Sequence, residues 1–156
     1  MKIREFARRL CWPLVTAQMS LIAAIISAGR APSKVIPFSF ESLALLLLAS
    51  GAVLGVWAII AMRIGNFSVL PTPVADGALC QRGPYSKIRH PMYTSVILFC
   101  SGFCVSTHTW FCWLAMLALV AVLIVKLHVE EFMLADKYTS YQEYSQRTHR
   151  LLPAVY

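Results

Sequence analysis

The chain has 156 residues, of which 58% are hydrophobic and only 13% are charged, and its formal net charge is +7. Soluble domains of this size carry about 25% charged residues, so this composition, with its long apolar blocks, excludes an ordinary soluble domain and indicates a membrane protein. Because basic residues flank the apolar blocks and no RNA- or DNA-binding motif is present, we interpret the positive charge as a topology signal and as contacts to anionic lipid.

The N-terminal segment begins with basic residues and continues into an apolar run, as a signal peptide does. The apolar run continues to about Ala28 without a convincing cleavage site, and further apolar runs follow it. We therefore predict a retained first transmembrane helix over residues 12–28, with Pro13 in its first turn.

The second apolar run predicts a transmembrane helix over residues 38–62, which is long enough to cross a bilayer with some tilt. Gly51 and Gly55 form a GxxxG pattern in it, which permits close contact with another helix. The connector that follows, residues 63–91, contains PTPVADG and RGPY, so we do not expect it to form one regular helix.

Two more apolar runs predict transmembrane helices over residues 92–106 and 110–127. The turn between them is short, so we expect these two helices to form an antiparallel hairpin. The polar tail, residues 128–150, is typical of an amphipathic helix that lies against the membrane or the bundle. Three tyrosines recur along it at a helical spacing: Tyr138, Tyr141 and Tyr144.

The distribution of Lys and Arg predicts the orientation, because cytoplasmic segments carry the excess of these residues. If the N-terminus is cytoplasmic, that side holds nearly all of them, and the opposite side holds only Arg30 and Lys34. We expect one all-α, polytopic integral membrane domain over residues 1–156, with about four transmembrane helices, a cytoplasmic connector and a C-terminal cytoplasmic helix. Both termini are predicted to be cytoplasmic.

In this topology the basic and aromatic connector lies beside the end of the fourth helix, because hairpin partners bring the start of one helix next to the end of the other. The polar side chains that meet there are Arg82, Tyr85, Lys87, Arg89, His90, Lys126, His128, Glu130 and Glu131. One interpretation is a salt-bridged rim at the membrane surface. The other is a pocket for a small, partly cationic ligand, in which carboxylates hold ammonium or hydroxyl groups and aromatic faces attract a sulfonium. The residues alone leave both open.

Several motifs in the C-terminal part occur in an order that resembles a known family. They are GALCQRGPYSKIRHPMY (Gly77–Tyr93), KLHVEE (Lys126–Glu131) and YQEYSQRTHRLLP (Tyr141–Pro153), with RIGNFSVLPTP (Arg63–Pro73) as a lead-in. From about Arg63 onward the chain resembles the isoprenylcysteine carboxyl methyltransferase family of integral membrane methyltransferases. Within that family it is similar to the small bacterial members of the broader phospholipid-methyltransferase-like group, which implies a bacterial inner membrane.

The resemblance implies that S-adenosylmethionine binds at the cytoplasmic ends of the last two transmembrane helices. Carried over by motif position, the residues implied to bind it are Ala78, Leu79, Cys80, Gly83, Tyr85, Arg89, His90, Pro91, Tyr93 and Glu130. Lys126 stands where the family usually has an Arg that contacts the substrate, and Glu131 lies behind or beside Glu130. No metal is implied.

The implied reaction is direct transfer of the sulfonium methyl group to a lipophilic acceptor that enters from the bilayer, such as an isoprenylcysteine-like carboxylate or a lipid. A carboxylate acceptor needs no general base, and Lys126 would orient it. An amine acceptor needs a base, for which Glu131 and His128 are the candidates. The sequence does not decide between the two acceptors.

Two other functions remain as alternatives. Some sterol-reductase-like proteins share a similar final hairpin and bind a nicotinamide cofactor there, although this chain has no extra spans to enclose a sterol. The other alternative is a non-catalytic membrane scaffold, in which the acidic pair and His90 form only a polar rim. The expected partners are a lipophilic or prenylated substrate and membrane lipids, and no nucleic acid.

Overall fold

The computed structural model describes residues 2–29, 38–62, 77–107 and 109–152. The lead-in motif, residues 63–73, lies outside the described residues. The helices in the described ranges are α1 (Lys2–Gly29), α2 (Phe38–Met62), the 3₁₀ turn η1 (Gly83–Ser86), α3 (Pro91–Thr107), α4 (Trp110–Lys137) and α5 (Tyr141–Arg147). The prediction of an all-α fold is confirmed.

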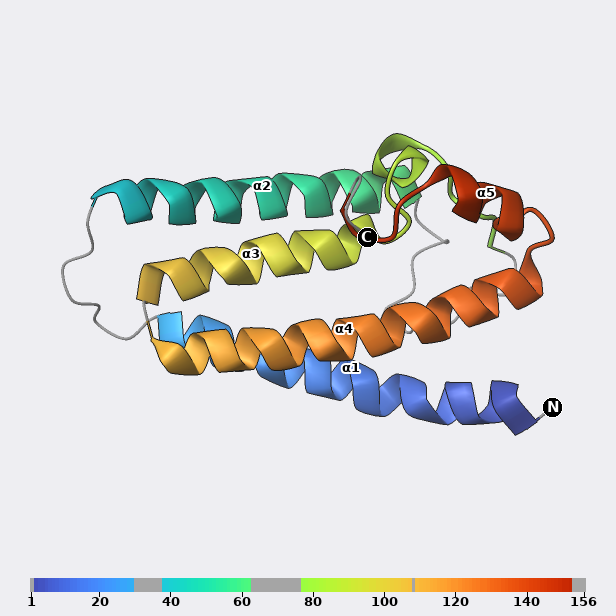
Figure 1. Cartoon of the computed structure of the whole chain (residues 1–156), viewed down its shortest axis with the longest axis horizontal. Helices are drawn as coiled ribbons and strands as arrows, with labels where there is room; N and C mark the ends of the chain where they lie inside the picture. The colour runs from blue at the N-terminus through green and yellow to red at the C-terminus, as the bar shows by residue number, and fades with distance from the viewer. Residues whose placement is uncertain (1, 30–37, 63–76, 108, 153–156) are drawn as a thin grey trace.

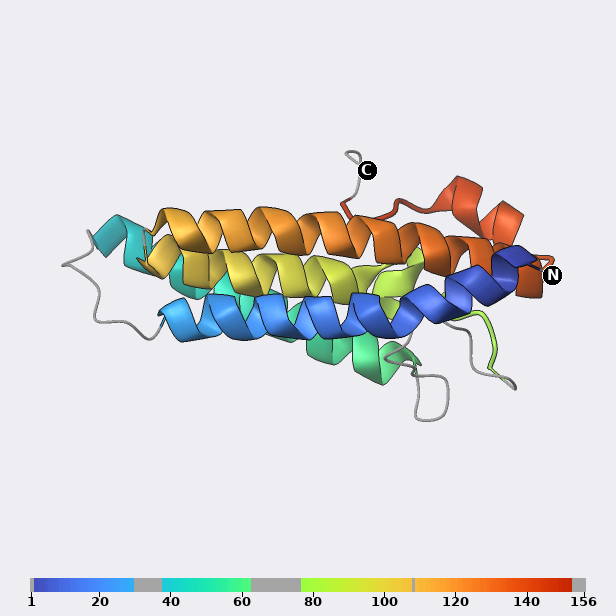
Figure 2. The same ribbon diagram turned by 90° about the horizontal axis from the view of Figure 1, so that it is seen from below.

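The helices α1 to α4 run lengthwise, and successive helices alternate in direction (Figures 1 and 2). α3 packs chiefly against α2, while α4 packs chiefly against α1 and also contacts α3. The end of α2, the start of α3 and the end of α4 therefore meet at one end of the bundle, where η1 and α5 also lie (Figure 1). The predicted meeting of the connector with the end of the fourth helix is confirmed.

The long helices are apolar enough to cross a membrane. The qualifying segments are Arg9–Ala28, Phe40–Met62 and Trp110–Lys137, and α3 is a shorter apolar helix. Large apolar side chains point outward along α2 and α4, among them Leu45, Ile60 and Leu117. Outward-facing side chains of this kind suit contact with lipid rather than water. The protein is a polytopic all-α membrane protein, and its orientation remains a prediction.

The bounds of α2 agree with the prediction, but two other helices are longer than expected. α1 already begins at Lys2, and α4 continues beyond residue 127 to Lys137. Hydropathy marks where apolar side chains end, whereas a helix continues as long as its backbone hydrogen bonds do. The predicted tail helix, residues 128–150, is consequently divided between the last turns of α4 and the short helix α5.

The GxxxG pattern brings α2 into close contact with α3 of the same chain. A Cβ atom on Gly51 would lie 2.6 Å from the backbone nitrogen of Phe99, and one on Gly55 would lie 3.1 Å from the Ser95 hydroxyl. Gly102 of α3 is equally confined, because its Cβ would lie 2.9 Å from the carbonyl oxygen of Ala44. Small residues on both helices thus fix the distance between their backbones.

Candidate active site

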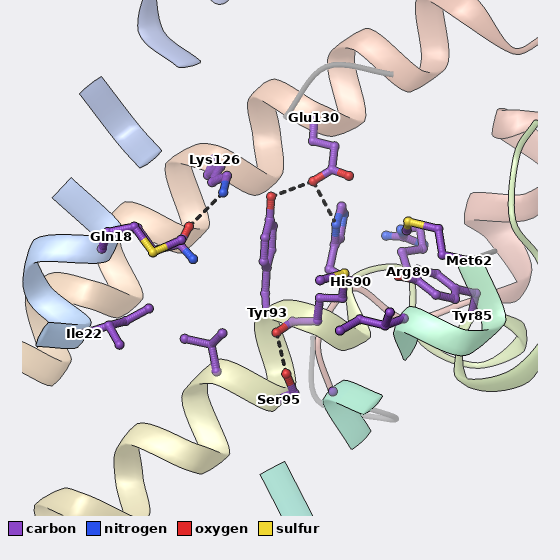
Figure 3. Close-up of a pocket in the computed structure, with 15 residues that line it drawn as sticks. Gln18, Ile22, Met62, Tyr85, Arg89, His90, Tyr93, Ser95, Lys126 and Glu130 are labelled. Carbon is purple, nitrogen blue, oxygen red and sulfur yellow. Dashed lines mark hydrogen bonds and ion pairs between the residues drawn. The ribbon is translucent and has the colours of Figure 1, made fainter. Parts of the chain in front are cut away.

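A cavity of about 330 Å³ opens among the four long helices and η1. This volume lies within the range of about 300–1,000 Å³ that is typical of small-molecule sites. Its polar side chains include Tyr85, Arg89, His90, Tyr93, Lys126 and Glu130 (Figure 3). Its apolar side chains come from α1, α2 and α3 and are Met19, Ile22, Ile59, Met62, Met92 and Val96. A polar cluster therefore adjoins an apolar space within one cavity.

Glu130 is the carboxylate on the cavity wall, and two side chains hold it. The Tyr93 hydroxyl donates a 2.6 Å hydrogen bond to Glu130 Oε2, and His90 Nδ1 lies 3.6 Å from the same oxygen. The rings of His90 and Tyr93 stack with their centroids 5.3 Å apart. The start of α3 and the last turns of α4 are joined by these contacts (Figure 3).

Glu131 is not among the lining residues and is held by two guanidinium groups. Arg89 Nε donates to Glu131 Oε1 at 2.8 Å, and Arg150 Nε donates to Glu131 Oε2 at 3.1 Å. His90 Nε2 lies 3.5 Å from Glu131 Oε1. His90 thus stands between two carboxylates, and the expected convergence of the acidic pair on this histidine is confirmed.

The tail fixes the connector from outside. Backbone nitrogens of Arg89 and His90 donate to the carbonyl oxygens of His149 and Arg150 at 2.7 and 3.0 Å. Arg89 Nη1 also donates to the carbonyl oxygens of Ser145, at 2.6 Å, and of Thr148. The guanidinium group of Arg89 therefore ties the connector, α4 and the residues around α5 into one unit.

Tail tyrosines make the same kind of contact farther along the connector. The Tyr144 hydroxyl donates to the carbonyl oxygen of Tyr85 at 2.7 Å, and the Tyr138 hydroxyl donates to that of Gly77 at 2.6 Å. Tyr141 and Tyr144 are buried against the connector, as their shared helical stripe predicts. These side chains hold the wall of the cavity in place without lining it.

The electrostatic environment favours a charged His90. Burial lowers the pKa of His90, but contacts with Glu130 and Glu131 outweigh burial and leave the pKa raised. Burial also raises the pKa of Tyr85, Tyr141 and Tyr144, which keeps these phenols neutral. The cluster therefore combines a histidine whose charged form is favoured by two carboxylates with neutral hydroxyl groups.

Two buried polar atoms of cavity residues have unused hydrogen-bonding capacity. Among the described residues, the Tyr85 hydroxyl has no hydrogen-bond partner, and His90 Nε2 has only the long 3.5 Å contact with Glu131 Oε1. Buried polar groups without partners are rare and suggest a ligand or water. Their presence on residues that line the cavity is consistent with a ligand site.

The predicted site residues are divided by the structure. Tyr85, Arg89, His90, Tyr93, Lys126 and Glu130 come together at the cavity. Other predicted residues lie outside its lining. Cys80 Sγ contacts the carbonyl oxygen of Ala61 at 3.4 Å, and Pro91 is buried at the start of α3. Ala78 and Leu79 precede Cys80, and the role of all four in cofactor binding stays a prediction.

Gly83 has a conformational reason for its position. Its φ of 58° lies in the left-handed region, and a Cβ there would lie 2.9 Å from the Ala61 side chain and 3.2 Å from Trp57 Nε1. Gly83 therefore packs the connector against the end of α2. Gly83 is not among the residues that line the cavity, and its role in cofactor binding stays a prediction.

The two candidate bases, Glu131 and His128, are not among the residues that line the cavity. Glu131 lies outside the lining, and both of its oxygens accept from guanidinium groups. His128 is exposed, and its Nδ1 donates to the carbonyl oxygen of Ile124 at 2.7 Å. The predicted catalytic role of Glu131 stays a prediction, and in the structure its carboxylate contacts Arg89, Arg150 and His90.

Sequence reasoning missed Gln18 of α1. Gln18 is buried and lines the cavity, and its Oε1 accepts a 2.8 Å hydrogen bond from Lys126 Nζ. The available signal is a carboxamide side chain within an apolar span. A polar residue inside a membrane segment is energetically costly and usually has a function.

The fold and the cavity define a class: a polytopic all-α membrane protein with a polar site built at one end of its helices and open to an apolar space. A family model described as phospholipid methyltransferase matches residues 40–141, and the chain therefore belongs to this family. No curated protein matches the chain. The family match confirms the resemblance found in the sequence and shows that the protein is a membrane methyltransferase.

Proposed function

We propose that the protein transfers a methyl group from S-adenosylmethionine to a lipophilic acceptor at the membrane–cytoplasm interface. The observation that carries this proposal is the composition of the cavity. Its acidic and aromatic part suits a small cationic donor, and the adjoining apolar part suits an acceptor that arrives from the bilayer. A site for two such different substrates is what methyl transfer to a lipid-like molecule requires.

The residues present fit the cofactor. When bound, S-adenosylmethionine supplies a methyl group on a positively charged sulfur. Glu130 offers a carboxylate for an ammonium or ribose hydroxyl group, and the ring of Tyr85 offers a face that attracts a cation. The Tyr85 hydroxyl, which has no hydrogen-bond partner among the described residues, offers a further polar contact.

The chain's own residues would bind, orient and exclude water. Tyr93 and His90 hold the Glu130 carboxylate in one orientation, so that it does not have to reorganise when a ligand binds. The apolar side chains from α1 and α2 keep water from the acceptor's part of the cavity. Lys126 lines the same cavity, which supports its proposed role in contacting the acceptor.

The direct test is a methyl-transfer assay on the detergent-purified full chain. The protein is incubated with methyl-labelled S-adenosylmethionine and a membrane lipid extract, and the labelled products are identified by mass spectrometry. We expect label in a lipid-soluble product, and little label with Glu130→Gln. Label that remains entirely in the methyl donor with every extract, while NADPH is oxidised, would support the reductase alternative instead.

A further inference from the structure

The side chains of Gln18 and Lys126 form a buried pair at the wall of the cavity. Lys126 Nζ donates to Gln18 Oε1 at 2.8 Å, and the Lys126 and Gln18 residues are 3% and 6% exposed. They belong to α4 and α1, and both line the cavity. α1 lies outside the part of the chain that the family model matches, residues 40–141.

The pair fixes the orientation of the Gln18 amide. A charged lysine can only donate hydrogen bonds, so the amide oxygen of Gln18 must face Lys126 and its NH₂ group must face away. Figure 3 shows the amide nitrogen turned away from Lys126 and toward the part of the cavity beside Tyr93. The NH₂ group is therefore a hydrogen-bond donor presented to the cavity.

The pair also lies at the boundary between the two parts of the cavity. The Lys126 nitrogen is 5.4 Å from the centroid of the Tyr93 ring, and the hydroxyl of that ring donates to Glu130. Met19 and Ile22, on the same helix as Gln18, belong to the apolar lining. A molecule whose chain occupies the apolar part would thus place its head group between these two donors and the polar cluster.

We propose that Gln18 is a specificity-determining residue, which together with Lys126 binds an anionic oxygen on the head group of the lipophilic acceptor. Two donors on one wall favour an oxygen that only accepts and disfavour an alkylammonium group, which only donates. The proposal rests on the proposed function in one respect, which is that the bound head group belongs to the methyl acceptor.

The test measures head-group selectivity without the methyl donor. Radiolabelled dodecanoate binds to the full chain in neutral detergent at about pH 8.5, where carboxylates are ionised and alkylamines remain protonated. Unlabelled dodecylamine and dodecanol compete with it. Wild-type protein should prefer dodecanoate to dodecylamine. Gln18→Leu should weaken dodecanoate binding about tenfold, as expected for one lost hydrogen bond between charged and neutral partners.

Gln18→Glu is the variant that separates recognition from packing, since it keeps the size of the side chain. Its carboxylate would pair with Lys126 and replace the NH₂ donor with an acceptor, so the preference should shift toward dodecylamine. Ser20→Ala, an exposed position of α1, should leave the preference unchanged. A purely structural pair would lower the melting temperature without changing the ratio of affinities.

The proposal would be overturned if the ratio of dodecanoate affinity to dodecylamine affinity were the same in wild type, Gln18→Leu and Gln18→Glu, whatever their stability. The result is independent of the proposed function, because the readout contains no S-adenosylmethionine. If selectivity follows residue 18 but the methyl donor does not bind, the methyl-transfer proposal fails and the head-group site stands. If S-adenosylmethionine binds but head-group selectivity is the same in the Gln18 variants, the head-group proposal fails and the methyl-transfer proposal stands.

Discussion

Replacing Glu130 with Gln removes the one carboxylate that lines the cavity among the described residues, while keeping the shape of the side chain. Gln can still accept from the Tyr93 hydroxyl, which donates to Glu130 Oε2 at 2.6 Å. What disappears is the negative charge, which lies 3.6 Å from His90 Nδ1. The variant therefore tests the electrostatic part of the site with little change in packing.

The magnitude follows from these contacts. A hydrogen bond to a charged group contributes about 1.5–3 kcal/mol, so losing one to a cationic ligand should weaken its binding roughly 10- to 150-fold. Breaking a buried ion pair costs about 3–5 kcal/mol of stability. The cost here should be smaller, because Glu131 remains 3.5 Å from His90 Nε2 as a second carboxylate partner.

The assay is equilibrium dialysis of labelled S-adenosylmethionine against detergent-purified protein, with melting followed by circular dichroism. Glu143→Gln is the matched control, because Glu143 is exposed on α5 and pairs only at the surface with Arg147, at 3.2 Å. We expect wild-type affinity in the control and the stated loss in Glu130→Gln. Affinity within twofold of wild type in Glu130→Gln would refute the assignment of Glu130.

Two further predictions concern packing and pH. Gly51→Ala should destabilise the fold by about 1–3 kcal/mol and lower the melting temperature, because the new methyl group would meet the backbone of Phe99. Gly55→Ala should cost less, because its methyl group would meet the side chain of Ser95. Equal losses of stability in the two variants would contradict the packing described. The pKa of His90 is raised by its two glutamate neighbours despite burial, so its charged form stabilises the fold fully below the unfolded-state pKa of 6.5, and this stabilisation is lost as the pH rises through the higher folded-state pKa. The difference in melting temperature between wild type and His90→Asn should therefore shrink as the pH is raised from about 6 to 9, and a difference that grows with pH would show that His90 is held neutral.

The positions of the apolar helices could be predicted from the sequence, because long runs of high hydropathy indicate membrane helices. α2 begins at Phe38 and ends at Met62, as the apolar run indicates. The polar ends were harder to predict. α4 continues through Glu130 and Glu131 because these side chains find partners on α3, the connector and the tail, and such long-range contacts leave no local pattern.

The site was predictable to the extent that it follows from topology. An antiparallel arrangement places the start of α3 beside the end of α4, so the meeting of His90 with the acidic pair followed from helix order alone. Which glutamate faces the cavity did not follow, because it depends on the rotation of α4 about its axis. The pairing of Gln18 with Lys126 is less predictable still, since it depends on how α1 packs against α4.

The central claim is that this cavity binds a methyl donor, and ligand-dependent melting of the full chain tests it most directly. Purified protein is heated with S-adenosylmethionine or with NADPH, because a ligand that binds the folded state raises the melting temperature. We predict a rise with S-adenosylmethionine that is lost in Glu130→Gln and retained in Glu143→Gln. A rise with NADPH and none with S-adenosylmethionine would contradict the account.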